Sequence, residues 1–242
     1  MTPELSSRKK VVLITGAAGG LGQELARQFL AQDWRVAAQY HHSVLHQSDP
    51  NLLQISGDIT QACQVNQMIQ SVLLHWRAVD VLVNNAGIAI DDPCWQVDDV
   101  SWEQQLSVNL KGAFFCCRAA AVPMANQGGG HIINIASFAG RQGSRGQSAY
   151  AAAKAGLLGL SASLARELGP DQVQVNAVLP GVLPTPMTAR LSQDQRSALV
   201  KENALQRLNS LDEVARFIVF LATMKNVSGQ VFQLDSRISP WT

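Results

Sequence analysis

The sequence predicts an α/β protein with one domain, residues 1–242, built on a doubly wound parallel sheet of the Rossmann type with helices on both faces. Short, continuous apolar runs recur along the chain, and longer stretches with helical periodicity lie between them. Apolar runs without alternation are typical of parallel strands that are buried on both faces. Because strand and helix alternate along the whole length, we expect βαβ units with right-handed crossovers and hence an open sheet.

The expected strands are the apolar runs at residues 11–15, 35–39, 52–56, 79–84, 131–136, 172–179 and 230–234. The expected helices span residues 21–32, 61–76, 99–126, 149–168 and 211–224. Two connections depart from this alternation. Residues 41–51 carry no helical pattern and contain the turn sequence Asp49-Pro50. After the sixth strand, three prolines lead into a long polar excursion, which predicts a substrate lid near residues 181–207.

The composition limits the partners that the chain can take. Its net charge of +1 gives no field that would attract nucleic acid or an anionic membrane. No apolar stretch reaches the roughly 18 residues that a membrane span needs, so we expect a cytoplasmic protein. The four cysteines show no metal-ligand spacing with the histidines, and we expect reduced thiols and no metal site.

A glycine-rich turn follows the first expected strand and opens the first helix. Residues 15–22 read Thr-Gly-Ala-Ala-Gly-Gly-Leu-Gly. Glycines permit a tight turn and let backbone N–H groups approach a pyrophosphate at the helix N-terminus, where the helix dipole favours an anion. The turn therefore predicts a dinucleotide site that includes Gly16, Gly20, Leu21 and Gly22.

The spacing T-G-x-x-x-G-x-G resembles that of the short-chain dehydrogenase/reductase family, and the likeness extends over about residues 10–235. Five further matches agree with it: N-N-A-G at 84–87, Y-x-x-x-K at 150–154, P-G-x-x-x-T-x-M at 180–187, the family's serine at Ser137 and its helix asparagine at Asn109. The resemblance implies an NAD(P)-dependent oxidoreductase that moves a hydride between a nicotinamide ring and a carbonyl or alcohol carbon. Its substrate would be a small molecule.

Tyr150 is the expected proton donor and acceptor. Lys154 lies four residues later on an expected helix, so the two side chains share a face. A free tyrosine has a pKa near ~10 and must fall by about 3 units to act near neutrality. A neighbouring ammonium group lowers the pKa of a tyrosine by ~1–3 units. The lysine and an oxidised nicotinamide together are therefore expected to lower it far enough, whereas either one alone is not.

The resemblance implies the roles of the remaining catalytic residues. Ser137 would hold the substrate oxygen as charge develops on it. Asn109 would anchor a water that links Lys154 to solvent, and Lys154 would also bond the nicotinamide ribose. Taken singly, each of these side chains has an ordinary structural explanation. Together they form the tetrad Asn109, Ser137, Tyr150 and Lys154.

The end of the second expected strand favours NADP(H), with NAD(H) as the alternative. An acidic residue here binds the ribose hydroxyls of NAD, but residues 39–43 read Gln-Tyr-His-His-Ser. Many NADP-using relatives carry Arg or Lys where this chain has Gly19, and Arg where it has His42. Asp58 and Ile59 resemble the family's adenine-binding pair. The other expected cofactor contacts are Tyr40, His41, His42, Asn85, Ala86, Gly87, Tyr150, Lys154, Pro180, Gly181, Leu183 and Thr185.

For the substrate, residues 150–157 and 186–195 most resemble 3-oxoacyl-acyl-carrier-protein reductases, which implies a β-ketoacyl thioester, free or bound to a carrier. The expected substrate contacts are Ile88, Ile90, Trp95, Ser137, Phe138, Gln147, Leu183 and Met187. Two alternatives stay open. Residues 40–43 are similar to the Y-H-R-S of pteridine reductases, which suggests a pteridine or quinoid reductase. A catalytically silent dinucleotide-binding regulator is the other.

Quaternary structure follows from the same resemblance. In this family the helix corresponding to residues 99–126 and the last strand usually form dimer and tetramer contacts, so we expect a homodimer or homotetramer. The last strand is often followed by D-G-G, whereas this chain has Asp235-Ser236-Arg237. This altered tail puts the contact through the last strand in question.

Overall fold

A computed structural model describes residues 8–238 of the chain. At its centre is a seven-stranded, entirely parallel sheet in the order β3-β2-β1-β4-β5-β6-β7. The order reverses between β1 and β4, and the crevice outside the carboxyl ends of two such strands is where doubly wound sheets bind ligands. The strands are β1 Val11–Ile14, β2 Arg35–Tyr40, β3 Leu52–Ser56, β4 Val81–Asn84, β5 Gly130–Ile135, β6 Val173–Leu179 and β7 Val231–Gln233.

Burial on both faces explains why the strands read as continuous apolar runs. In β1, Val12 and Ile14 belong to the core on one face, whereas Val11 and Leu13 belong to the core on the other. Successive side chains of a strand point to opposite faces, so a strand that is covered on both faces is apolar at most of its positions. The expected doubly wound sheet is thus confirmed.

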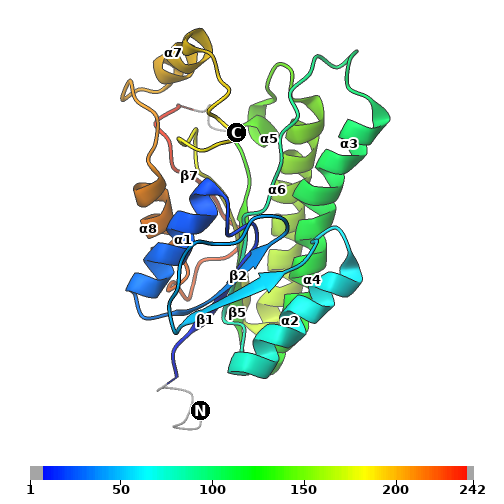
Figure 1. The fold of residues 1–242 in the computed structure, drawn as a ribbon, viewed down its shortest axis with the longest axis vertical. Coiled ribbons are helices and arrows are strands. Elements are labelled where there is room, and N and C mark those ends of the chain that lie inside the picture. The colour runs from blue at the N-terminus through cyan, green and yellow to red at the C-terminus, as the bar shows by residue number, and fades with distance from the viewer. Residues whose placement is uncertain (1–7, 239–242) are drawn as a thin grey trace.

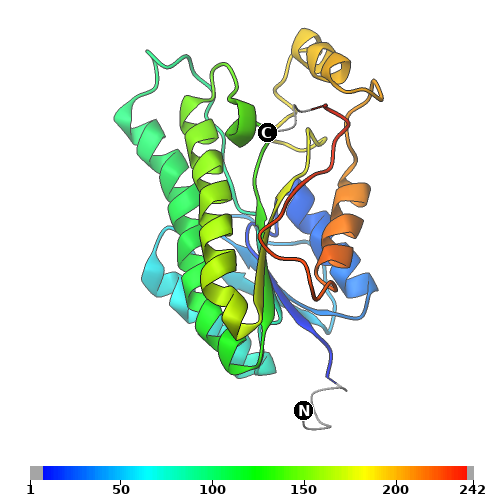
Figure 2. The same cartoon turned by 180° about the vertical axis from the view of Figure 1, so that it is seen from behind.

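Helices cover both faces of the sheet, as Figures 1 and 2 show from opposite sides. Helices α1 and α8 pack on one face and α2, α4 and α6 on the other. The helices are α1 Gly20–Ala31, α2 Ala62–Trp76, α3 Asp99–Leu106, α4 Ala113–Asn126, α5 Ala139–Gln142, α6 Ser148–Leu168, α7 Gln193–Glu202 and α8 Leu211–Leu221. A 3₁₀ turn, Gly169–Asp171, follows α6.

The long helix expected at residues 99–126 is not continuous. A π-helical segment, Ser107–Gly112, separates α3 from α4. It contains Asn109, whose buried side chain turns to the loop after β4: Oδ1 accepts from the Ile88 N–H at 3.0 Å and Nδ2 donates to the Ile88 carbonyl at 2.8 Å. Such bulges shift a side chain out of the regular helical position. The amide of Asn109 is thereby directed at the end of β4.

The two unusual connections lie where the sequence places them. Residues 41–51 contain no helix, and the side chain of Gln54 instead bonds the N–H and carbonyl of the buried Leu45 at 3.0 and 3.1 Å. The excursion after β6 contains α7, which stands beyond the carboxyl ends of the strands in Figure 1. Among residues 8–238, no helix has both the length and the hydrophobicity of a membrane span. In the same range, no three His, Cys, Asp or Glu side chains are grouped to hold a metal ion.

Candidate active site

The glycine turn is held against the end of β4 by hydrogen bonds that its own motif supplies. Thr15 Oγ1 accepts from the N–H groups of Asn85 and Ala86 at 3.0 and 3.1 Å. The amide of Asn85 returns two bonds, both 3.0 Å, to the carbonyls of Thr15 and Gly16. Gly16 has φ +62°, and a Cβ there would lie 2.7 Å from Ala86 Cα. The 15–22 and 84–87 motifs thus form one rigid structure at the switch point of the sheet.

Gln39 stabilises this turn, a role that the sequence did not predict. Its buried side chain accepts from the Gly16 N–H at 2.8 Å and donates to the Gly57 carbonyl at 2.6 Å. One amide therefore joins the glycine turn to the segment after β3. A carboxylate could accept the first bond but could not donate the second.

Gly22 offers a direct test of the turn. A Cβ at this position would overlap the Gly16 carbonyl oxygen and lie 2.7 Å from Ala17 Cα, both of them backbone atoms. We expect Gly22→Ala to displace the turn, weaken dinucleotide binding at least about tenfold and lower the free energy of unfolding by about 1–3 kcal/mol. Cofactor fluorescence titration and thermal unfolding measure the two effects.

Gly159→Ala is the matched control, because Gly159 lies on the exposed side of α6 and a Cβ there would meet nothing within 4 Å. Alanine is the better helix former, so this change is expected to stabilise the protein by up to about 1 kcal/mol and to leave binding unchanged. Equal binding by Gly22→Ala and the wild type would show that the turn does not hold the cofactor.

The four predicted catalytic residues come together at the carboxyl ends of β4 and β5. Ser137 follows β5, and its hydroxyl lies close enough to the Tyr150 phenol to oppose the rise in the pKa of that phenol. Lys154, one turn further along α6, has its Nζ 5.7 Å from the centre of the Tyr150 ring. A Cβ on Gly87 would lie 2.9 Å from Asn109 Oδ1 and 3.6 Å from Lys154 Nζ, so Gly87 fits between these two side chains.

Burial dominates the electrostatics of this cluster. It raises the pKa of Tyr150; the hydrogen bond with Ser137 opposes this rise, and the negative charge of Asp91 adds to it. Burial also lowers the pKa of Lys154 to about 8, although its Nζ donates to the Ile135 carbonyl at 2.8 Å. Without a bound cofactor, burial therefore outweighs the groups that would make the phenol of Tyr150 more acidic.

At the end of β2, the exposed rings of His41 and His42 have their centres 3.8 Å apart and are tilted by 35° to each other. Asp58 Oδ1 accepts from the Thr60 N–H at 2.9 Å, and the buried Ile59 packs against the π-helical segment near Gly112. His41 and His42 follow β2, and Asp58 and Ile59 follow the neighbouring strand β3. The imidazole and backbone N–H groups here can serve a phosphate as hydrogen-bond donors.

The start of the excursion after β6 also reaches the glycine turn. A Cβ on Gly20 would lie 2.8 Å from Thr185 Cγ2, and Gly181 turns the chain with φ +78°. Leu183 is buried, and its carbonyl accepts a hydrogen bond from Thr188 Oγ1 at 2.5 Å. The 180–187 motif therefore lies beside the 15–22 motif, as a shared cofactor site requires.

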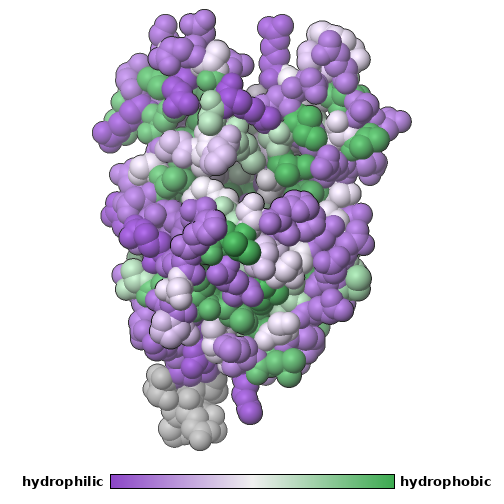
Figure 3. Space-filling model, viewed as in Figure 1, coloured by the Kyte–Doolittle hydropathy of each residue, from purple (hydrophilic) through white to green (hydrophobic). Residues whose placement is uncertain are grey.

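On the substrate side the structure adds two charged side chains that the sequence analysis did not select. Asp91 accepts from Gln147 Nε2 at 2.9 Å and lies 3.2 Å from Arg190 Nη2. Arg190 also donates to the Ala89 carbonyl at 2.7 Å, which ties the excursion to the loop after β4. Nothing in their spacing along the chain indicates this contact. Figure 3 shows a hollow on this side of the molecule, between the part that carries α7 and the part that carries α3 and α5.

The predicted substrate residues are only partly gathered. Phe138 directly follows Ser137, and Ile88 and Ile90 are held through their backbones by the side chains of Asn109 and Gln105. Trp95, by contrast, is 78% exposed, and Met187 is 40% exposed. Both face solvent in this structure, and their part in substrate binding stays a prediction.

Comparison with known proteins agrees with this fold and site. The family model for short chain dehydrogenase matches residues 10–196. The chain belongs to this family, and it is an NAD(P)-dependent oxidoreductase that acts on CH–OH or C=O groups.

Among individual proteins, the chain is similar to 3-oxoacyl-[acyl-carrier-protein] reductase FabG of Staphylococcus epidermidis, with 33% identity over 93% of this chain and 97% of the relative. It is 35% identical to the FabG of Thermotoga maritima over 95% of this chain and 97% of the relative. A solved structure described as "ElxO with NADP Bound" superposes with a TM-score of 0.87 and 27% identity, over 95% of this chain and 98% of that one.

Proposed function

We propose that this protein reduces the ketone of a 3-oxoacyl thioester, free or carrier-bound, with NADPH as the hydride source. The observation that carries the proposal is the half-buried Tyr150, whose phenol lies beside Ser137 and one helical turn before the buried Lys154. A ketone oxygen in reach of both hydroxyl groups would accept two hydrogen bonds as negative charge develops on it. The similarity to the FabG reductases supports the choice of thioester.

Each member of the tetrad has a separate task in the proposed reaction. When bound, the reduced nicotinamide supplies the hydride to the carbonyl carbon. Ser137 holds the carbonyl oxygen, and Tyr150 donates the proton that turns it into the alcohol. Lys154 carries positive charge beside the phenol and would bond the nicotinamide ribose. Asn109, held by both backbone groups of Ile88, is placed to anchor a water that returns the proton to Lys154.

NADP(H) is proposed over NAD(H) because residues 39–43 contain no carboxylate that would repel a 2′-phosphate. The relative solved with NADP bound supports the same choice. The proposed contacts of this phosphate are the exposed His41 and His42. We expect NADPH to bind more tightly than NADH by at least about threefold, measured by nucleotide fluorescence in the absence of substrate. Equal affinities would remove the basis for NADP.

The substrate is tested by following NADPH oxidation with an acetoacetyl thioester, a dihydropterin and simple diketones. Reduction of the thioester with the highest kcat/KM is expected, because the predicted substrate residues are largely apolar and suit an acyl chain. Activity on the pterin alone would select the pteridine reductase, for which the likeness of residues 40–43 is the argument. Binding of NADPH without turnover of any carbonyl would select the silent regulator.

We further propose that the protein works in the cytoplasm and that residues 181–207 close over the substrate as a lid. We also propose that it forms a homodimer or a homotetramer. Apolar side chains exposed on α3 and α4, among them Phe114 and Val122, support an interface through these helices. Light scattering of the purified protein measures the oligomeric state. A monomer at micromolar concentration would contradict this part of the proposal.

A further inference from the structure

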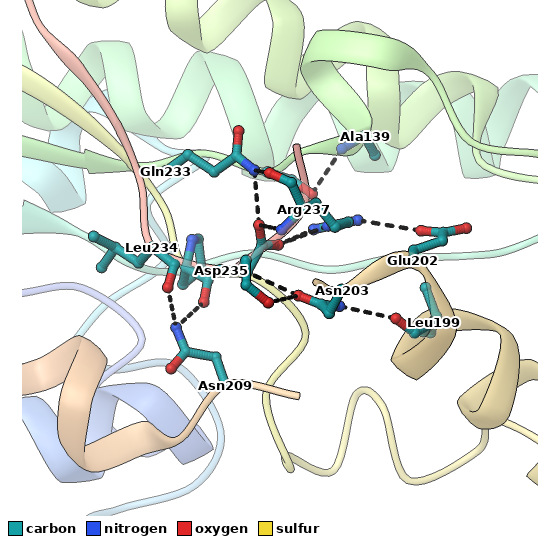
Figure 4. Close-up of polar contacts among 12 residues, drawn as sticks. Ala139, Leu199, Glu202, Asn203, Asn209, Gln233, Leu234, Asp235 and Arg237 are labelled. Atoms are coloured by element: carbon teal, nitrogen blue, oxygen red, sulfur yellow. Dashed lines mark hydrogen bonds and ion pairs between the residues drawn. The ribbon is translucent and has the colours of Figure 1, made fainter. Parts of the chain in front are cut away.

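The tail after β7 runs between α7 and the loop that carries the catalytic serine, as Figure 4 shows. Gln233 Nε2 donates to Asp235 Oδ1 at 2.8 Å and to the Arg237 carbonyl at 2.7 Å. Ser236 donates from its backbone N–H and its hydroxyl to Asn203 Oδ1, both at 3.2 Å. The tail is therefore fixed at three successive residues, in the segment where Ser236 and Arg237 replace the expected glycines.

Arg237 and Asp235 form a buried ion pair inside this tail. Arg237 Nε donates to Asp235 Oδ2 at 2.7 Å, and Nη2 contacts the same oxygen. The two side chains are only 10% and 3% exposed. A buried ion pair persists only where further hydrogen bonds satisfy its atoms, and here Gln233 bonds the second carboxylate oxygen. Glu202, at the end of α7, lies 3.9 Å from the outer Nη1.

The fixed guanidinium lies over the ring of a residue of the proposed substrate site. Its central carbon is 3.8 Å from the centre of the Phe138 ring. Phe138 directly follows Ser137, whose Oγ accepts from the Ala139 N–H at 3.2 Å and so opens α5. On the opposite side of the pair, a Cβ on Gly181 would lie 2.7 Å from Asp235 Cβ. The ion pair thus fills the space between the serine loop and the start of the excursion after β6.

We propose that Arg237 is a positioning residue of the active site, which holds the Phe138 ring as a wall of the substrate pocket through a planar stack. The inference rests on the proposed function, because it takes Ser137 and Phe138 to contact the substrate. A planar cation attracts the face of an aromatic ring, and a guanidinium stacks on it as a lysine ammonium cannot. Without Arg237 the ring would gain freedom, and substrates of different size would be distinguished less well.

The test compares Arg237→Met and Arg237→Lys with the wild type, using the carbonyl compound that the wild type reduces fastest. Methionine keeps the apolar stem without the charge, and lysine keeps the charge without the plane. We expect Arg237→Met to raise KM about tenfold and to leave kcat within about twofold of the wild type. The KM of Arg237→Lys is expected to lie between those of the wild type and Arg237→Met. The matched control is Arg216→Met, which removes an exposed arginine paired with Asp212 on α8 and is expected to leave KM unchanged.

A double-mutant cycle identifies the path of the effect. If Arg237 acts through the ring, adding Arg237→Met to Phe138→Ala will raise KM by less than about twofold beyond the value of Phe138→Ala alone. Multiplication of the two single effects would overturn the proposal. The proposal would also be overturned if Arg237→Met lowered the melting temperature and left KM and substrate discrimination unchanged. That result would indicate a purely structural role for Arg237.

A readout without turnover separates this inference from the proposed function. We expect faster hydrogen exchange at residues 138–142 in Arg237→Met and unchanged exchange in Arg216→Met. If the wild type reduced no carbonyl compound, the proposed function would fail on that observation. Unchanged exchange at residues 138–142 would overturn the positioning role whatever the substrate proves to be.

Discussion

Replacing Tyr150 with phenylalanine is expected to reduce kcat by about 10²–10⁴-fold, which is the usual contribution of a positioned proton donor. The ring still fills its place at the start of α6, so the change removes only the hydroxyl group beside Ser137. The alkoxide that forms on hydride transfer would then lack its proton source. Steady-state NADPH oxidation at saturating carbonyl substrate measures the loss.

Two measurements on Tyr150→Phe keep the interpretation clear. The affinity for NADPH is expected to stay within about threefold of the wild type, and the melting temperature should change little, because one hydroxyl group adds only about 1 kcal/mol to stability. Turnover that survives the change within a few-fold would refute the proton-donor role. A large loss of nucleotide affinity would instead show that the hydroxyl serves the cofactor.

Replacing Lys154 with methionine is expected to lower kcat at least about a hundredfold and also to change how stability depends on pH. Burial lowers the pKa of Lys154 from 10.5 to about 8. The unfolded chain therefore keeps this proton over a range in which the folded chain has released it. The buried charge destabilises the fold below this range, and the destabilisation disappears as the pH rises through it.

The wild type is expected to gain stability relative to Lys154→Met as the pH rises. Between pH 8 and 10.5, the wild type should gain free energy of unfolding relative to Lys154→Met, by up to roughly 3 kcal/mol at about 1.4 kcal/mol per pH unit. Burial also raises the pKa of the Cys116 and Cys117 thiols, but these groups titrate in both proteins and cancel in the difference. Urea unfolding at a series of pH values measures it.

The matched control is Lys225→Met, because Lys225 is exposed. An exposed lysine has nearly the same environment in both states, so this variant should follow the wild type at every pH. Parallel curves for the wild type and Lys154→Met would mean that Lys154 is not desolvated in the folded protein. The proposed proton path through its ammonium group would then lack its basis.

Much of the fold could be predicted because each strand is buried on both faces and so carries a continuous apolar run. The first expected strand, 11–15, differs by one residue from the observed Val11–Ile14. The helix expected at 99–126 was wrong in one respect, since Ser107–Gly112 is π-helical. The bonds that stabilise this irregularity join Asn109 to Ile88, which is 21 residues away, and helical periodicity carries no information about such a contact.

The four residues of the expected catalytic cluster were predicted from the resemblance to a family, and the structure brings them together. Parallel strands bring their carboxyl ends to one edge, which is where Ser137 and the 84–87 motif meet. The direction of the pKa shift at Tyr150 could not be predicted. It depends on burial and on the charge of Asp91, which lies 59 positions earlier in the chain.

The sequence by itself determined the order of strands and helices, the glycine-rich turn and the spacing of the expected catalytic side chains. These features depend on local periodicity and on residues that are close together in the chain. Only the tertiary structure decided which side chains support them: Gln39 beneath the glycine turn and Arg237 upon the ring of Phe138. Arg237 and Phe138 are 99 positions apart and come from different strand ends. Contacts of this kind depend on the packing of the whole sheet, which no local pattern records.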